Sequence, residues 1–335
     1  KQFVVKLIEE YLDRSRYTYS IATTERVGHA TELAQKAVRE GADIVCAIGG
    51  DGTVNEVANG LVHTQTALAI IPSGSGNGLA RHLRIPTDPL NAIKILNRGM
   101  TQVMDYGIVN GKSFFCTCGV GFDAFISQKF AESGKRGPVS YLENVLNNSL
   151  KYHPETYDVE IVNNKDNEEI HQACKAFLIS CANASQYGNN AYIAPSASVR
   201  DCMMDVTIIE PFTAIEAPLI ATQLFSGTIE QNSRIKTFQC QKVKIHRSQP
   251  GAVHYDGDPI VMGEDVEVEL MAGGLLCVCP AEEGMPEVEV RVQNFITEHF
   301  RNMYNKTEEL IQQNMLKTQR ITQLNNDNLR KLSGK

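Results

Sequence analysis

The chain has 335 residues, of which 42% are hydrophobic and 21% are charged, and its formal net charge at pH 7 is −7. This length accommodates roughly two or three domains, and this composition excludes a disordered or fibrous protein. The negative balance argues against nucleic-acid binding, and no apolar run approaches the ~20 residues of a membrane-spanning helix. There is no basic and apolar leader, and the nine cysteines form no C-x-x-C pair, so we expect reduced thiols and a cytoplasmic location.

Helix and strand patterns alternate from the first residue to about residue 107. Helical spacing is found in segments 1–14, 29–41, 53–63 and 89–99, and strand patterns in segments 17–24, 42–50 and 67–74. This alternation predicts a parallel, doubly wound α/β domain over residues 1–107. Because a helix in such a fold normally follows a strand and its loop, we expect a first strand to be missing ahead of residue 1.

The pattern changes after residue 107 to short β-rich segments separated by turn residues. They continue to about residue 280, with one helical stretch near 138–151, and predict a mostly antiparallel β-sandwich or barrel over residues 108–280. Residues 281–335 form a C-terminal tail that is polar from Glu287 onward, with apolar residues every three or four positions. We expect this tail to be an amphipathic helix that packs on the body or on a partner.

Two glycine-rich turns follow adjacent predicted strands, GGDGT at residues 49–53 and IPSGSGN at residues 71–77. Glycines lack Cβ, so a ligand can approach the backbone, and the N–H groups that begin the next helix suit a phosphate. Asp51 would repel a phosphate unless a cation lies between them, which indicates Mg²⁺. Either turn alone could be a tight, capped strand-to-helix connection, but two neighbouring ones predict a two-sided phosphate cleft.

GGDGTVNEVANGL followed by IPSGSGN resembles the diacylglycerol kinase catalytic-domain superfamily, which includes bacterial lipid kinases, sphingosine kinases and ceramide kinases. The resemblance runs from about residue 1 to 280. It implies a phosphofructokinase-like nucleotide domain, a β-sandwich domain, and a cleft where ATP gives its γ-phosphoryl group to a lipid hydroxyl. NAD kinases and phosphofructokinases share the GGDG core but lack the second motif at this distance.

The resemblance also implies roles for individual residues. The nucleotide-contacting residues would be Thr24, Gly49, Gly50, Asp51, Gly52, Thr53, Val54, Asn55 and Ser75. The family's D-G-E motif, whose acid is taken as the catalytic base, corresponds to residues 256–258, with Asp258 in place of the usual Glu. This shorter acid reaches ~1.5 Å less, which leaves a weak or inactive kinase as an alternative. From the residues alone, D-G-D also predicts a type I′ hairpin turn.

Two further segments match family motifs. GVGFDA at 119–124 matches a motif that faces the cleft, where Asp123 would hold Mg²⁺ or orient the acceptor. Segment 193–206 resembles the loop that binds a structural Mg²⁺, with the carboxylate of Asp201 and the carbonyl groups of Ser198 and Met203 as ligands. The family's glycine after this aspartate is Cys202 here, and an acidic turn without metal is the alternative.

We therefore predict an ATP- and Mg²⁺-dependent lipid kinase that acts on diacylglycerol or a sphingoid base. In this mechanism Asp51 acts through Mg²⁺, and Asp258 accepts the proton of the lipid hydroxyl. Gly78, where diacylglycerol kinases usually carry Asp, brings the motif closer to that of sphingosine kinases. Alternatives are a soluble kinase like NAD kinase and a binding protein without catalysis. We expect transient contact with a membrane surface through Lys135 and Arg136, and leave a homodimer open.

Overall fold

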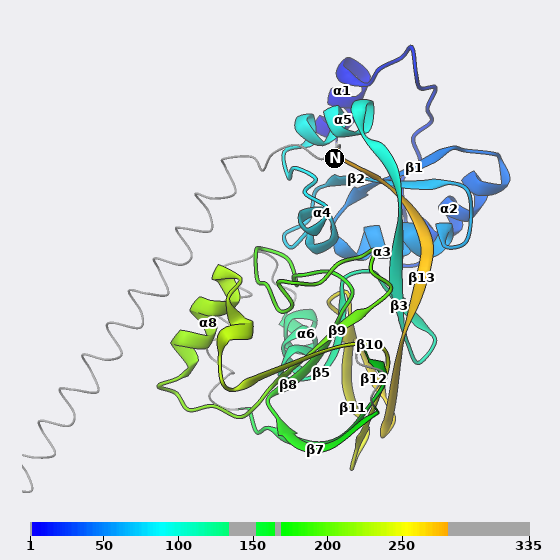
Figure 1. Cartoon of the computed structure of the whole chain (residues 1–335). Helices are drawn as coiled ribbons and strands as arrows, with labels where there is room; N and C mark the ends of the chain where they lie inside the picture. Colours follow the sequence, from blue (N-terminus) through cyan, green and yellow to red (C-terminus); the bar gives the residue numbers. More distant parts are fainter. Residues whose placement is uncertain (1, 134–151, 165–168, 281–335) are drawn as a thin grey trace, which may run out of the picture.

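The computed structural model describes residues 2–133, 152–164 and 169–280 of the chain (Figure 1). The helical stretch predicted near 138–151, the basic pair Lys135 and Arg136, and the helical tail predicted for 281–335 lie outside the described residues. Among the described helices, none combines the length and the apolar character that crossing a bilayer requires.

The N-terminal half is a layered α/β unit, in which two parallel strands run between two pairs of helices (Figure 1). Its elements are α1 (Gln2–Tyr11), α2 (His29–Arg39), β1 (Ile44–Gly49), α3 (Asp51–Leu61), β2 (Ala67–Pro72), α4 (Gly78–His82) and α5 (Pro89–Arg98). Helices α2 and α3 lie on one side of the strands, and α1 and α5 lie on the other. The parallel register runs from Ile44 opposite Ala67 to Gly49 opposite Pro72, so both strands end at the same edge.

The strand expected over residues 17–24 is absent, and this segment is irregular. Its alternating pattern reflects two tyrosines, Tyr17 and Tyr19, that pack partly against the core of the N-terminal half. The Tyr17 hydroxyl donates to the carbonyl oxygen of Leu96, at the end of α5, at 3.0 Å. The segment is thus held through side chains without a backbone ladder, and alternation alone does not distinguish this from a strand.

A long antiparallel ribbon joins the two halves of the protein. It consists of β3 (Met100–Val109) and β13 (Asp265–Cys279), with a bulge between Met271 and Leu275. Near its end, Cys277 of β13 pairs in parallel with Leu68 of β2. The last described strand therefore returns to the N-terminal sheet, and the domain boundary predicted at residue 107 falls inside β3.

The C-terminal half is the predicted β-rich unit, and it continues the same sheet through β10 (Ile235–Arg247). This strand pairs with β13, with β9 (Met204–Ile209) and with β6 (Glu155–Asn164). The remaining strands of this half are β4 (Lys112–Phe114), β5 (Thr117–Gly121), β7 (Ile170–Ala176), β8 (Leu178–Ala182), β11 (Gly251–Tyr255) and β12 (Asp258–Met262). Alternate residues of these strands, such as Val243 and Ile245 of β10, fill one buried apolar core.

Two helices of this half were not predicted, α6 (Phe122–Ser133) and α8 (Ala217–Ser226). In α6, apolar side chains point in several directions because the helix packs against β5, β11 and β12. In α8 seven of the ten residues are apolar, and they are not confined to one side of the helix. Neither segment therefore has the one-sided periodicity from which a helix is recognised.

Candidate functional site

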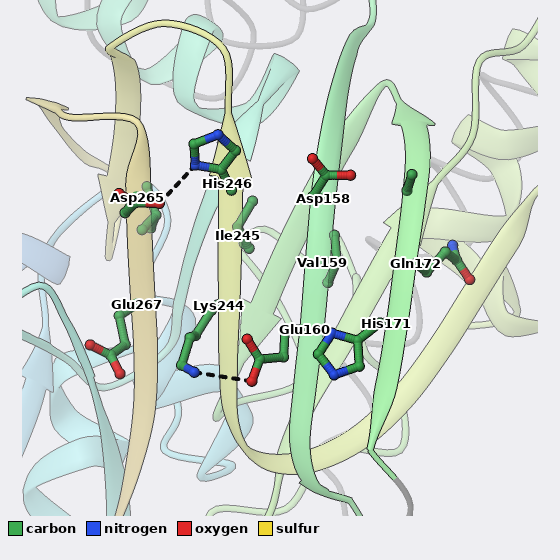
Figure 2. Close-up of a pocket in the computed structure, with 12 residues that line it drawn as sticks. Asp158, Val159, Glu160, His171, Gln172, Lys244, Ile245, His246, Asp265 and Glu267 are labelled. Atoms are coloured by element: carbon green, nitrogen blue, oxygen red, sulfur yellow. Dashed lines mark hydrogen bonds and ion pairs between the residues drawn. The ribbon is translucent and has the colours of Figure 1, made fainter.

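A groove of about 480 Å³ lies on the outer face of the C-terminal half, across β7, β6, β10 and β13 (Figure 2). Two ion pairs join neighbouring strands there: Lys244 contacts Glu160 at 3.0 Å, and His246 contacts Asp265 at 2.7 Å. Figure 2 shows these pairs lying along the sheet surface. None of the residues singled out from the sequence lines this groove, so it is not the site that the motifs indicate.

The two glycine-rich turns lie against each other at the shared carboxyl edge of β1 and β2. The Ser73 N–H donates to the carbonyl oxygen of Gly49 at 2.8 Å. A Cβ on Gly50 would lie 2.9 Å from the Cα of Gly74, and a Cβ on Gly74 would collide with the Cα of Gly50. Two of the glycines that we expected to leave space for a ligand therefore let two backbones touch, which joins the turns into one surface.

Asp51 ties the first turn to the second. One of its carboxylate oxygens accepts from the Asn77 N–H at 2.9 Å, and the other accepts from the Gly78 N–H at 2.6 Å. Burial raises the pKa of Asp51, while these backbone donors act in the opposite direction. Asn77 itself, at φ 52°, closes the second turn through both atoms of its amide on Gly74.

The other residues predicted to contact the nucleotide divide into two groups. Ser75 is exposed, and Gly52 and Thr53 are half-buried at the beginning of α3, so these three border open space. Val54 and Asn55 point inward, and the Asn55 amide donates to the Ser113 carbonyl at 3.1 Å. Val54 and Asn55 therefore pack beneath the first glycine turn and do not face a ligand.

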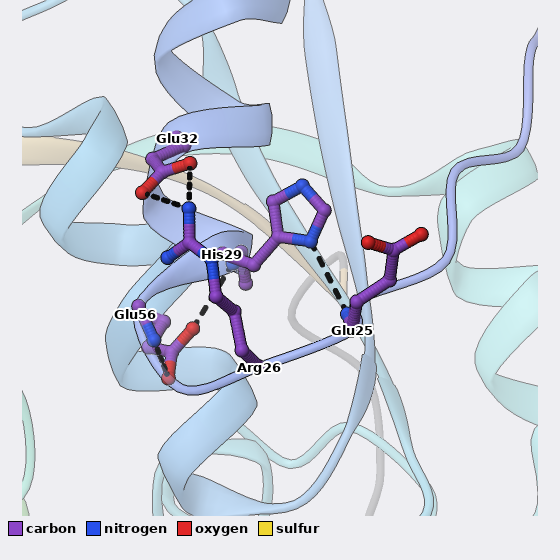
Figure 3. A network of polar contacts seen from close by, with 7 residues as sticks. Glu25, Arg26, His29, Glu32 and Glu56 are labelled. Atoms are coloured by element: carbon purple, nitrogen blue, oxygen red, sulfur yellow. Dashed lines mark hydrogen bonds and ion pairs between the residues drawn. The ribbon is translucent and has the colours of Figure 1, made fainter.

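Thr24 lies in the loop that precedes α2, and this loop is anchored to α3 by Glu56 (Figure 3). The Glu56 carboxylate accepts from the N–H groups of Gly28 at 2.8 Å and Ala30 at 3.0 Å, and so satisfies free donors at the beginning of α2. Sequence reasoning did not single out Glu56, because its partners lie 28 and 26 residues away.

The two aspartates of the D-G-D hairpin have opposite environments. The hairpin has the predicted left-handed pair, with φ 48° at Asp256 and 87° at Gly257. The Asp256 carboxylate points inward and accepts from Asn55 Nδ2 and from the N–H groups of Phe115, Cys116 and Thr117, at 2.8 to 3.2 Å. Asp256 thus holds the β4–β5 connection and the inner side of α3 together.

Asp258 begins β12, is exposed, and faces the first turn of α3. Its Oδ2 lies 3.8 Å from the position that a Cβ on Gly52 would take. No hydrogen-bond partner for its carboxylate is found among the described residues. Partial desolvation, followed by the nearby carboxylates of Glu56 and Asp51, raises the pKa of Asp258. The C-terminal half therefore brings an unengaged acid to the glycine surface of the N-terminal half.

Asp123, in the first turn of α6, lies in a buried polar cluster. Its Oδ2 accepts from the Tyr187 hydroxyl at 3.0 Å and from His254 Nε2 at 3.0 Å, and its Oδ1 accepts from the Ala124 N–H at 2.8 Å. Gly119 makes room for this carboxylate, because a Cβ there would collide with Asp123 Oδ2. Tyr187 and His254 were not anticipated from the sequence.

The three residues predicted to bind structural magnesium lie in one turn before β9. Asp201 is exposed, and its Oδ1 accepts from the Met203 N–H at 3.2 Å, while Ser198 Oγ accepts from the Arg200 N–H at 3.3 Å. Cys202 has φ 59°, a left-handed conformation that favours glycine. No cluster of three or more His, Cys, Asp or Glu side chains suited to a metal occurs within the part of the chain that the structure describes. This metal loop stays a prediction.

Comparison with known families agrees with the order of the two halves. Residues 1–109 match the diacylglycerol kinase catalytic domain, and residues 116–275 match the YegS C-terminal NAD kinase beta sandwich-like domain. The chain belongs to the diacylglycerol kinase catalytic-domain superfamily. The resemblance and the fold class predicted from the sequence are confirmed, and the two matched domains support a kinase.

The relatives described below have low sequence identity to this chain. An uncharacterized protein, sll0036, from Synechocystis is 28% identical over 293 residues, which are 82% of this chain and 66% of that protein, just under two thirds of its length. A diacylglycerol kinase of Bacillus subtilis is 27% identical over 263 residues, 77% of this chain and 84% of that protein. The crystal structure of a diacylglycerol kinase from Bacillus anthracis has a TM-score of 0.58 and 19% identity, and the match covers 82% and 91% of the two chains. At this identity the structural likeness concerns the fold.

Proposed function

We propose that this protein transfers the γ-phosphoryl group of ATP, with Mg²⁺, to the hydroxyl group of a membrane lipid of the diacylglycerol or sphingoid-base type. The observation that carries this proposal is the position of Asp258. Asp258 comes from the C-terminal half and lies against the glycine turn of the N-terminal half. Its pKa is raised, and its carboxylate has no hydrogen-bond partner within the part of the chain that the structure describes. A carboxylate that lies beside the glycine turns, where we place the phosphates, is suited to accept a proton from an acceptor hydroxyl.

The residues present fit a magnesium-bound nucleotide. Burial, followed by the nearby carboxylates of Glu56 and Asp51, raises the pKa of Asp258, so a cation bound between Asp258 and the phosphates would relieve this repulsion. The oxygens of Asp51 and Glu56 already accept backbone N–H groups, so Asp258 is the carboxylate of the three that has no hydrogen-bond partner among the described residues. When bound, Mg²⁺ would neutralise charge on the phosphates. The chain's own part is to present the backbone N–H groups of residues 50–53, at the beginning of α3, and the Ser75 hydroxyl to the phosphates, and to position Asp258 as the base.

Three other predicted site residues enter the proposal with more limited roles. Thr24 approaches the nucleotide from the loop that Glu56 holds in place. Asp123 acts through its donors, because both of its oxygens already accept hydrogen bonds from the protein. Asp201, with the carbonyl groups of Ser198 and Met203, would hold a structural Mg²⁺ that stiffens the turn before β9. The acceptor is embedded in a bilayer, so the proposal includes a cytoplasmic protein in peripheral contact with the membrane.

The test is transfer of radiolabelled phosphate from ATP to a panel of diacylglycerol, sphingosine and ceramide in mixed micelles, with NAD as a soluble acceptor. The Asp258→Asn variant should lose about 10²–10⁴-fold in kcat, the usual contribution of a general base. Asp258→Glu, which restores the family's usual residue, should keep activity. The matched control is Asp265→Asn, an exposed aspartate that contacts His246 on another strand and should leave the rate unchanged.

Each other outcome of this assay counts against a stated part of the proposal. Transfer to NAD alone would replace a lipid with a soluble nucleotide as the acceptor. Nucleotide binding without transfer to any acceptor would indicate a binding protein that has lost catalysis. Full activity of Asp258→Asn would show that another group accepts the proton.

A further inference from the structure

A loop of the C-terminal half, residues 185–190, is docked on the second glycine turn. The Asn189 N–H donates to the Gly76 carbonyl oxygen at 3.2 Å. Gly188, at φ 110°, has no room for a Cβ, which would lie 2.8 Å from the Gly76 backbone. Arg81 Nε donates to the same carbonyl at 3.1 Å, and its guanidinium also reaches Asn190 Oδ1 at 3.3 Å. The turn that we assign to the phosphates is therefore supported from the other half of the protein.

The same loop is also fastened to α4, the helix that follows this turn. His82 Nδ1 accepts from the Ser185 N–H at 3.1 Å and lies 2.9 Å from Ser185 Oγ. Burial lowers the pKa of His82 to about 4, so the ring is neutral and Nδ1 is free to accept. Contacts at both ends of the loop fix its position relative to the second turn.

Tyr187, in the middle of this loop, connects the loop to the strand that leads into the D-G-D hairpin. Its hydroxyl and His254 Nε2 both donate to Asp123 Oδ2. His254 lies in β11, four positions before Asp258, and its side chain is 2% exposed. Among the described residues nothing partners His254 Nδ1, so the bond to Asp123 is the single polar contact that orients this buried ring.

We propose that Gly76, the 185–190 loop, Tyr187, Asp123 and His254 form a coupling chain that sets the distance between the second glycine turn and Asp258. This inference rests on the proposed function and adds two positioning residues, Tyr187 and His254, that act through Asp123. In-line transfer requires the phosphate and the base to be aligned, and a shift of ~1 Å can cost about 10²-fold in rate. The coupling chain contacts the second glycine turn at one end and the D-G-D hairpin, which carries Asp258, at the other. It therefore provides that alignment.

The kinetic test compares wild type with Tyr187→Phe, which removes only the hydroxyl. We expect kcat for lipid phosphorylation to fall about ten-fold while the KM for ATP changes less than about two-fold, because alignment is lost and binding is not. The matched control is Tyr17→Phe, which removes a hydroxyl bonded to the Leu96 carbonyl at 3.0 Å in the N-terminal half and should leave kcat unchanged. Tyr187 acts only through the Asp123 carboxylate in this coupling chain. Adding Tyr187→Phe to Asp123→Asn should therefore lower kcat no further than Asp123→Asn does alone.

Amide hydrogen exchange gives a readout that does not depend on the acceptor. In Tyr187→Phe, exchange should become faster both in residues 74–78 and in residues 254–258, with β6 and β10 unchanged. Faster exchange confined to the 185–190 loop, a kcat within about two-fold of wild type, or additive losses with Asp123→Asn would overturn the coupling chain. If wild-type protein phosphorylates no lipid, the proposed function fails, and the exchange pattern alone decides for or against the coupling chain.

Discussion

Replacement of each aspartate in the D-G-D hairpin by asparagine should separate stability from activity. The two carboxylates are two residues apart, but they point in opposite directions. Asp256 accepts four hydrogen bonds from the protein, whereas Asp258 has no such partner among the described residues. We expect Asp256→Asn to destabilise the fold strongly, and Asp258→Asn to lower the rate of transfer by about 10²–10⁴-fold without destabilising the fold.

The magnitude follows from the geometry of Asp256. Oδ1 accepts from the N–H groups of Cys116 and Thr117, and Oδ2 accepts from the Phe115 N–H and Asn55 Nδ2. An asparagine can keep only one of these oxygens, so its amide group would face two donors that are left unpaired. At about 1–3 kcal/mol for each unpaired buried group, we expect Asp256→Asn to lower the free energy of unfolding by about 3 kcal/mol.

Urea unfolding, followed by fluorescence and circular dichroism, measures this difference. Asp258→Asn should change the free energy of unfolding by less than about 0.5 kcal/mol, as exposed substitutions usually do. Removing its charge also relieves repulsion from Glu56 and Asp51, so any shift should be toward higher stability. Equal stability of the two variants would refute the assignment of Asp256 as the structural acid and Asp258 as the unengaged one.

Three further predictions concern Gly74 in the second glycine turn, His82 in α4, and Asp258. Gly74→Ala should lower both stability and nucleotide affinity, because its Cβ would collide with Gly50; Gly263→Ala, which has open space around the new methyl group, is the control in thermal unfolding and ATP titration. His82 has its pKa lowered by burial from 6.5 to about 4, so its contribution to stability is fully present above pH 6.5 and declines as the pH falls toward 4, by about 3 kcal/mol in total. A urea midpoint that falls as steeply in His82→Gln as in wild type between pH 7 and 5 would contradict this. Because the pKa of Asp258 is raised, the ionised base should be lost, and kcat should fall, at a pH above the usual aspartate value of 3.8; the pH–rate profile of wild type should show this limb and that of Asp258→Asn should not.

The local part of the site was accessible from the sequence. The strand–turn–helix order of β1 and α3, and of β2 and α4, follows from apolar runs that end at glycine and begin again with helical spacing. The hairpin at 256–257 follows from D-G between strands. These features depend on residues within a few positions of each other, so backbone sterics and local hydrogen bonding are sufficient to predict them.

Where local patterns were ambiguous, prediction was wrong or incomplete. Segment 17–24 alternates like a strand but is held by tyrosine side chains, and α6 and α8 lack a one-sided apolar face. The role of Glu56 as a cap of α2 has no local signal, because its acceptor oxygens and the N–H groups that they bind come from different helices. A sequence pattern reports which face of an element is apolar and does not report which element covers it.

The sequence by itself determined the phosphate-type turns, the family and the order of an α/β half before a β-rich half. Only the tertiary structure decided that Gly50 and Gly74 let the turns touch, and that Asp256 holds the fold while Asp258 faces the first turn of α3. The same is true of the cluster in which Asp123 meets Tyr187, 64 residues away, and His254, 131 residues away. The physical reason is the distance along the sequence between interacting residues. Turns and helix starts depend on residues that are neighbours in the sequence, whereas the partner of a buried polar group depends on how the two halves of the protein pack together.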